Sequence, residues 1–158
     1  IEPLFEIAQK RYPKILELIT RYEDYVDENG DEDNSEYKRI QGLIQEIAQK
    51  DVSGYSLYET WEAEGPEILA FRISLPDPGK LENISEEELK EVIHRIKKCE
   101  YLAEENDNDF ALEFSGCLDN YYHKFLAVNY PKKYKYALFI RQKDGSFLTE
   151  KQIIEKLL

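Results

Sequence analysis

The sequence is poor in the residues that build covalent frameworks and redox sites. Its 158 residues include no methionine, two cysteines, two histidines and one tryptophan. Two cysteines give no disulfide framework, so we expect Cys99 and Cys117 to be reduced thiols in a cytoplasmic protein. There is no C-x-x-C and no H-E-x-x-H pattern, and His94 and Cys99 would point to different sides of a helix. We therefore expect no metal site and no cofactor.

Long hydrophobic runs are also missing. No apolar stretch approaches the roughly 18 residues that a membrane-spanning helix needs. The first residues lack a basic stretch followed by an apolar one, so we expect no signal peptide in this chain. Because position 1 is isoleucine, we expect the natural start to lie upstream. No phosphate-binding glycine loop and no G-x-S-x-G element is present, which leaves nucleotide-dependent and α/β-hydrolase chemistry without support.

The composition is that of a folded, strongly acidic protein. The chain is 42% hydrophobic and 34% charged, with a formal net charge of −12. These values predict a single domain over residues 1–158. An acidic surface disfavours nucleic acid and anionic membranes, and it attracts basic partners.

One segment, from Glu23 to Glu36, concentrates the negative charge. It contains no lysine or arginine and eight carboxylates: Glu23, Asp24, Asp27, Glu28, Asp31, Glu32, Asp33 and Glu36. A dense block of like charge repels itself and stays solvated. The block could bind a cation, face a basic partner or form a plain solvated loop, and the sequence leaves these three possibilities open.

Two helical patterns flank the acidic run. Apolar residues recur at steps of three, four and seven from Leu4 to Val26, and Pro13 is expected to kink or split this helix. Ser35 is a good N-cap for a second helix that reaches about Asp51. Residues 1–51 are therefore predicted to form an antiparallel helical hairpin with the acidic run at its tip.

The remainder, residues 52–158, is predicted to mix strands with helices. Alternating apolar residues predict strands at 55–63, 69–75, 110–114 and 134–140, with a short return segment at 146–148. The predicted fold class is α+β, in the order ααββαβαβα, with a mainly antiparallel sheet of about four strands packed against helices.

Three helices are predicted in the same region. Ser85 with Glu88 and Thr149 with Gln152 have the spacing of capping boxes at the starts of two of them. Residues 118–129 fit a third helix. The last helix carries an apolar stripe, which is expected to dock on the sheet or to form a dimer contact. The stripe consists of Ile153, Ile154, Leu157 and Leu158.

Cys117, Asp119 and His123 form the most plausible catalytic group. A thiol near an imidazole can act as a nucleophile with its base, and Asp119 would orient His123 from one helical turn away. Cys117 would precede the first turn of the helix, where a thiol pKa is lowered. A buried cysteine is the commoner outcome, so an enzyme is the alternative interpretation and not the leading one.

The acidic run also resembles a calcium-binding loop in part. With Tyr25 at position 1, Gly30 falls at the sharp turn and Glu36 at the closing bidentate position. Tyr25 stands where a carboxylate ligand is required, and Glu32 stands where an apolar anchor is normal. Weak calcium binding by a helix-loop-helix is therefore a further alternative.

Tyrosines beside Lys132, Lys133 and Lys135 could bind single-stranded nucleic acid. The predicted strand would turn Tyr134 and Tyr136 inward, and the net charge of −12 repels phosphates, so no nucleic-acid partner is expected.

The leading functional hypothesis is a non-catalytic acidic module that binds a basic protein. The eight carboxylates of the acidic run would form the contact surface, extended by Glu59, Glu62 and Glu64. By analogy of charge alone, a bacterial immunity-type inhibitor of a nuclease toxin would behave in this way.

Overall fold

The computed structural model describes residues 1–158 and contains helices and loops without any β-strand. The α-helices are α1 (Phe5–Asn29), α2 (Ser35–Ala48), α3 (Pro66–Ser74), α4 (Glu86–Lys98), α5 (Asp109–Glu113), α6 (Asp119–Asn129) and α7 (Glu150–Leu157). Short 3-10 helices lie at η1 (Thr60–Glu62), η2 (Ser115–Cys117) and η3 (Tyr136–Phe139). None of these helices combines the length and the apolar character that crossing a bilayer requires.

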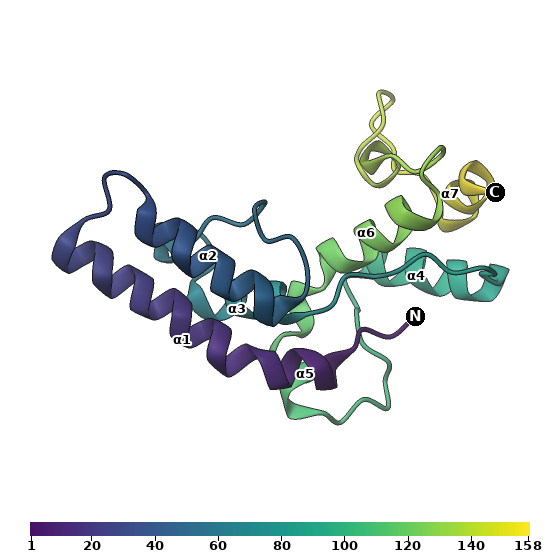
Figure 1. Ribbon diagram of the computed structural model, residues 1–158. Coiled ribbons are helices and arrows are strands. Elements are labelled where there is room, and N and C mark those ends of the chain that lie inside the picture. The colour runs from purple at the N-terminus through teal and green to yellow at the C-terminus, as the bar shows by residue number, and fades with distance from the viewer. The chain divides into compact units, whose positions relative to one another are not determined.

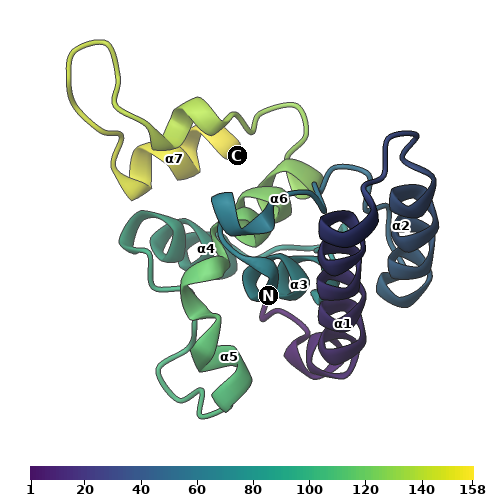
Figure 2. The ribbon, with the colours of Figure 1, turned by 90° about the vertical axis from the view of Figure 1, so that its left-hand side faces the viewer.

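The chain divides into two compact units. The N-terminal unit is Leu4–Pro76, and the C-terminal unit is Asp77–Leu158 together with Ile1–Pro3. The N-terminal unit contains α1, α2 and α3, and the C-terminal unit contains α4, α6 and α7 (Figures 1 and 2). The single domain expected from the sequence stays a prediction.

The N-terminal unit confirms the predicted helical hairpin. Helices α1 and α2 lie side by side and antiparallel, joined by a short loop (Figure 1). Pro13 does not split α1, which runs as one helix of 25 residues. Gly30, with a φ of +69°, ends α1, because glycine adopts this left-handed backbone without steric cost.

Helix α3 packs against α1 and closes the core of this unit. The buried side chains come from all three helices and from the loop between α2 and α3: Ile15, Leu18, Ile19, Tyr22, Ile40, Ile44, Ala48, Val52, Leu57, Ala70 and Ile73. Burying one isoleucine or leucine side chain away from water contributes about 1.5–3 kcal/mol to the free energy of unfolding. The apolar stripes that predicted α1 and α2 therefore supply most of this core.

The predicted α+β fold is wrong, and the first two strands show why. Residues 69–74 belong to α3, which begins at Pro66 directly after Gly65, and Leu75 is its C-cap. Proline at the first helical position has a φ suited to a helix, and Gly65 precedes it with a φ of +97°. Residues 55–63 form turns and η1. A short apolar run buried on several sides has no periodicity that separates strand from helix.

The other predicted strands fail for similar reasons. Residues 110–113 lie in α5 and Phe114 is its C-cap. The Asn108 side chain caps the N-terminus of α5 by accepting the Ala111 N–H at 2.9 Å. Residues 134–140 form a loop and η3, and Tyr136, predicted to pack inward, is 62% exposed. The segment 146–148 is a loop that closes a turn at Gly145.

The predicted helices of the C-terminal unit are confirmed. Both capping boxes form, at Ser85 with Glu88 and at Thr149 with Gln152. Helix α4 packs against α6 and α7 (Figure 2). With no sheet present, α7 buries its stripe among helices, and of that stripe only Leu158 is exposed.

Arg95 is the main polar group in the core of this unit and is only 4% exposed. Its guanidinium donates to the Tyr122 hydroxyl at 2.6 Å, to a Glu91 carboxylate oxygen at 2.9 Å and to Glu2. Burial alone would lower the pKa of Arg95, but hydrogen bonds to Glu2 and Glu91 outweigh it and raise the pKa. Arg95 thereby ties the first residues of the chain to α4 and α6.

We expect Arg95→Ala to lower the free energy of unfolding by about 3–5 kcal/mol, because it leaves several acceptors without their buried donor. Chemical denaturation followed by circular dichroism measures the change. Lys98→Ala, on the exposed side of the same helical turn, is the control and should stay within about 0.5 kcal/mol of the parent. Equal effects of the two substitutions would contradict the role given to Arg95.

Candidate protein-binding site

The acidic run covers the last turns of α1, the connecting loop and the first turn of α2. The structure separates its eight carboxylates into two groups. Four of them, Glu23, Asp31, Asp33 and Glu36, accept hydrogen bonds from the chain itself. The other four, Asp24, Asp27, Glu28 and Glu32, are exposed and have no hydrogen bond or ion pair within the protein.

Asp31 is the internal anchor of the loop. One carboxylate oxygen accepts the Tyr37 N–H at 2.9 Å and the Tyr22 hydroxyl at 3.0 Å, and the other accepts the Glu36 N–H at 3.2 Å. The first amides of a helix have no partner within the helix. Asp31 supplies partners for two of them, and its negative charge is favoured at the helix N-terminus.

Asp33 and Asn34 complete the cap of α2. The Asp33 carboxylate accepts the Ser35 N–H at 3.0 Å, and this hydrogen bond lowers the pKa of Asp33. The Asn34 carbonyl accepts the Lys38 N–H at 3.0 Å. Ser35, expected from its type to be the N-cap, is instead the first helical residue, and Asn34 takes the N-cap position with a φ of 59°.

Three of the four partnerless carboxylates lie where the helix disfavours them. Asp24, Asp27 and Glu28 are spaced three and four apart, so they share one face of α1 and repel one another. Asp27 and Glu28 stand in the last turn of α1, which contains no basic residue. A helix C-terminus carries partial negative charge and favours cations there. These charges therefore carry a cost in stability, a pattern that is typical of functional sites.

The segment that follows α2, residues 52–65, is attached beside the tip by tyrosines. The Tyr58 ring stacks on Tyr37 at a centroid distance of 5.0 Å and meets the edge of Tyr22 at 5.5 Å. The Tyr37 hydroxyl donates to the Tyr55 carbonyl at 3.2 Å, and the Thr60 hydroxyl donates to Glu23. These contacts hold η1 close to the acidic carboxylates of α1.

This attachment displays Trp61, which sequence reasoning did not identify as a site residue. Trp61 is the single tryptophan of the chain and is 71% exposed. Glu59 and Glu62 flank it and are exposed, whereas Glu64 forms a two-point ion pair with Arg72 at 2.8 Å. The available signal was a lone tryptophan among carboxylates, but the predicted strand concealed that it stands in a turn.

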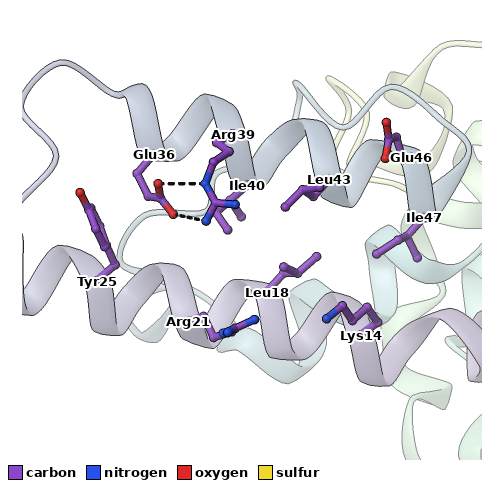
Figure 3. A pocket seen from close by; sticks show the side chains of 10 residues that line it. All are labelled: Lys14, Leu18, Arg21, Tyr25, Glu36, Arg39, Ile40, Leu43, Glu46 and Ile47. Carbon is purple, nitrogen blue, oxygen red and sulfur yellow. Dashed lines mark hydrogen bonds and ion pairs between the residues drawn. The ribbon is translucent and has the colours of Figure 1, made fainter.

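A groove with a volume of about 600 Å³ runs between α1 and α2 on the side that bears Tyr25 (Figure 3). Apolar side chains of both helices line it: Leu18, Ile40, Leu43 and Ile47. Its cations have carboxylate partners, since Lys14 and Arg21 pair with Glu17 and Arg39 pairs with Glu36. The groove therefore has a mixed lining, in which the apolar side chains lie among these ion pairs, Tyr25 and the exposed carboxylate of Glu46.

The backbone of the acidic run differs from that of a calcium-binding loop. Helix α1 continues through Asn29, so Tyr25 and Asp27, the first two ligand positions, are helical. Asp31, at the seventh position, is committed to the amides of α2. The structure contains no group of three or more carboxylate, histidine or cysteine side chains placed to hold a metal ion.

The proposed catalytic residues lie at the start of α6, as the sequence predicted. Cys117 ends η2, Asp119 opens α6, and His123 follows one turn later. The His123 Nδ1 atom lies 2.7 Å from the Tyr134 hydroxyl, and its ring contacts Tyr136 and Phe139. Burial lowers the pKa of His123, and Asp119 opposes this effect. Their catalytic role stays a prediction.

Comparisons with protein-family models, curated proteins and solved structures find no match to this chain. The candidate site is therefore defined by geometry and charge. It consists of the four partnerless carboxylates, called the acidic tip below, with Trp61 and the groove between α1 and α2 beside them.

We expect Asp31→Ala to lower the free energy of unfolding of the N-terminal unit by about 2 kcal/mol, because a cap and three hydrogen bonds are lost. Glu32→Ala removes the neighbouring charge, which has no partner, and should change stability by less than about 0.5 kcal/mol. Thermal or urea unfolding measures both. Equal losses of stability in the two variants would show that Asp31 is no more important to the fold than the partnerless Glu32.

The C-terminal unit should lose stability as the pH falls below about 6.5. The pKa of His123 is lower in the folded chain than in the unfolded chain, so the unfolded chain binds more protons between the two values. His123→Gln should reduce the loss between pH 7.5 and 5.5, as measured by urea unfolding at each pH. An unchanged pH dependence in this variant would contradict the lowered pKa of His123.

Proposed function

We propose that this chain is a non-catalytic module that binds a basic protein through its acidic tip. The observation that carries the proposal is the position of Asp24, Asp27, Glu28 and Glu32. All four are exposed and partnerless, and two stand at the helix end that disfavours negative charge. A cationic partner would remove both costs, because its lysines and arginines would pair with the carboxylates and oppose the helix dipole.

The tip has the electrostatics of a steering surface. Clustered charges of one sign raise the rate of encounter with an oppositely charged protein, and salt suppresses this effect. The loop is held in place by Asp31, so the carboxylates are presented from a fixed backbone. A preformed surface pays less conformational entropy on binding than a mobile one.

Apolar contacts beside the tip would supply the slower dissociation that charge alone does not provide. Exposed tryptophans are enriched among the residues that dominate binding energy. Trp61 lies in the segment attached beside the tip, and Tyr25, next to the tip carboxylate Asp24, lines the groove together with Leu43 and Ile47 (Figure 3). The partner is therefore proposed to carry both cations and exposed apolar side chains.

Occlusion is the mechanism that these features support. A protein that binds nucleic acid presents a basic surface, and a cluster of carboxylates can cover it. The proposal in its finer form is an immunity-type inhibitor of a bacterial nuclease toxin, and charge complementarity is its only support. Cys117 and His123 have no part in this mechanism.

The test compares the chain with a tip variant that combines Asp24→Asn, Asp27→Asn, Glu28→Gln and Glu32→Gln. Each protein serves as bait in a pull-down from the source cell, and association rates are then measured by stopped flow for the protein recovered. We expect the tip variant to associate at least tenfold more slowly at physiological salt, with a much weaker salt dependence.

A matched control makes the same charge change in the C-terminal unit by converting Glu82, Glu87, Glu104 and Glu105 to glutamine. It should bind like the parent. The tip variant should also unfold at a temperature equal to or above that of the parent, because it removes repulsion, so that slower binding does not reflect misfolding. Equal association rates for the tip variant and the control would overturn the proposed function.

A further inference from the structure

The C-terminal unit carries a basic counterpart to the acidic run. From Asn120 to Lys143 the sequence contains no aspartate or glutamate, and its lysines and arginine are Lys124, Lys132, Lys133, Lys135, Arg141 and Lys143. Most of these residues lie in the connection between α6 and α7, which includes a loop that projects away from the helices (Figure 2). Residues 132–147 are called the basic segment below.

Hydrogen bonds hold the basic segment in a defined conformation. The Gln142 side-chain amide donates to the Ile140 carbonyl at 2.7 Å and to the Ala137 carbonyl at 2.9 Å. The Gln142 N–H donates to the Ser146 carbonyl at 2.7 Å and closes the turn. Tyr134 and Phe139 fix the start of the segment against His123. The segment is therefore anchored at several points.

The exposed side chains of this segment are mainly cations and apolar groups, together with one carboxylate, Asp144, which accepts the Ser146 N–H at 2.9 Å and the Ser146 hydroxyl at 2.6 Å. Lys132, Lys135, Arg141 and Lys143 are exposed and have no carboxylate partner, whereas Lys124 pairs with Asp77 at 2.7 Å. Tyr136, Ile140 and Phe147 are exposed among them, with fractions of 62%, 44% and 54%. This surface is cationic and apolar, which is the chemistry that the acidic tip and Trp61 complement.

We propose that the basic segment of one copy binds the acidic tip of a second copy. Four free cations face four free carboxylates in this pairing, and the exposed aromatic groups of the segment would cover Trp61. The inference rests on the proposed function, since it uses the same tip as a cation-binding surface. It adds that the chain itself carries a fitting partner surface.

A second copy fits the segment better than a phosphate-bearing partner does. A second copy, which also has a net charge of −12, is repelled at long range as nucleic acid and anionic membranes are, so the local chemistry of the segment must distinguish these partners. The Arg141 guanidinium already lies over the Phe147 ring, 5.5 Å from its centroid, and Ile140 offers no flat face for a base. Stacking on single-stranded bases needs free aromatic faces.

The two surfaces are different, so the contact is heterologous. A contact of this kind leaves one tip and one segment unoccupied in every pair and continues into a ring or an open chain. The area offered by one loop and one hairpin tip is small, which places the association in the weak class. Assembly is therefore expected at high protein concentration and low salt.

The test uses the tip variant and a segment variant with Lys135→Gln, Arg141→Gln and Lys143→Gln in sedimentation equilibrium. The mass of the parent should rise with concentration at low salt and return to one chain at about 0.5 M salt. Each variant alone should remain one chain. Their equimolar mixture should reach two chains and stop, because the pair contains one intact tip and one intact segment.

The control variant converts Lys80, Lys151 and Lys156 to glutamine, and it should assemble like the parent. A parent that remains one chain at about millimolar concentration and low salt would overturn the inference, as would assembly that persists in both variants. Single-chain mass together with segment-dependent binding of anionic vesicles or single-stranded DNA would overturn it too. In each case the proposed function survives if the tip variant still loses its basic protein partner.

Discussion

The interactions of the Asp31 carboxylate determine the form of the hairpin tip. Eight carboxylates within fourteen residues repel one another, and like charges one helical turn apart cost roughly 0.2–0.5 kcal/mol per pair. Asp31 offsets part of this cost by accepting the Tyr37 and Glu36 amides and the Tyr22 hydroxyl. The loop is thereby ordered between two helices, and the tyrosines around it position the segment that carries Trp61.

The carboxylates of the acidic run therefore fall into two groups with different roles. Those with internal donors shape the backbone, and those without donors project from it. Two of the latter, Asp27 and Glu28, stand in the last turn of α1, where the helix dipole opposes them. A loop that was only solvated would gain nothing from carboxylates in that position. The proposed basic partner and the proposed pairing of copies would each supply this charge with cations from outside the N-terminal unit.

The sequence predicts the helices well and the strands badly, for a physical reason. Stripes with a 3.6-residue period identified α1 and α2, and side-chain spacing identified the caps at Ser85 and Thr149, because these signals are local. In the segment 69–75 apolar residues alternate with others as in a strand, but the segment is also short and apolar enough for a buried helix. Only tertiary packing decides between strand and helix there. The sequence predicted the site as one run of charge. It could not separate the carboxylates that have internal donors from those that have none, since residue type does not reveal that Asp31 accepts from three donors and Glu32 from none.

Amide hydrogen exchange at the start of α2 tests the central claim most directly. First-turn amides normally exchange quickly because they lack partners within the helix. If Asp31 holds the tip, the Glu36 and Tyr37 amides should be protected to nearly the same degree as amides in the middle of α2. Exchange of these two amides at the rate of an unstructured loop would contradict the account.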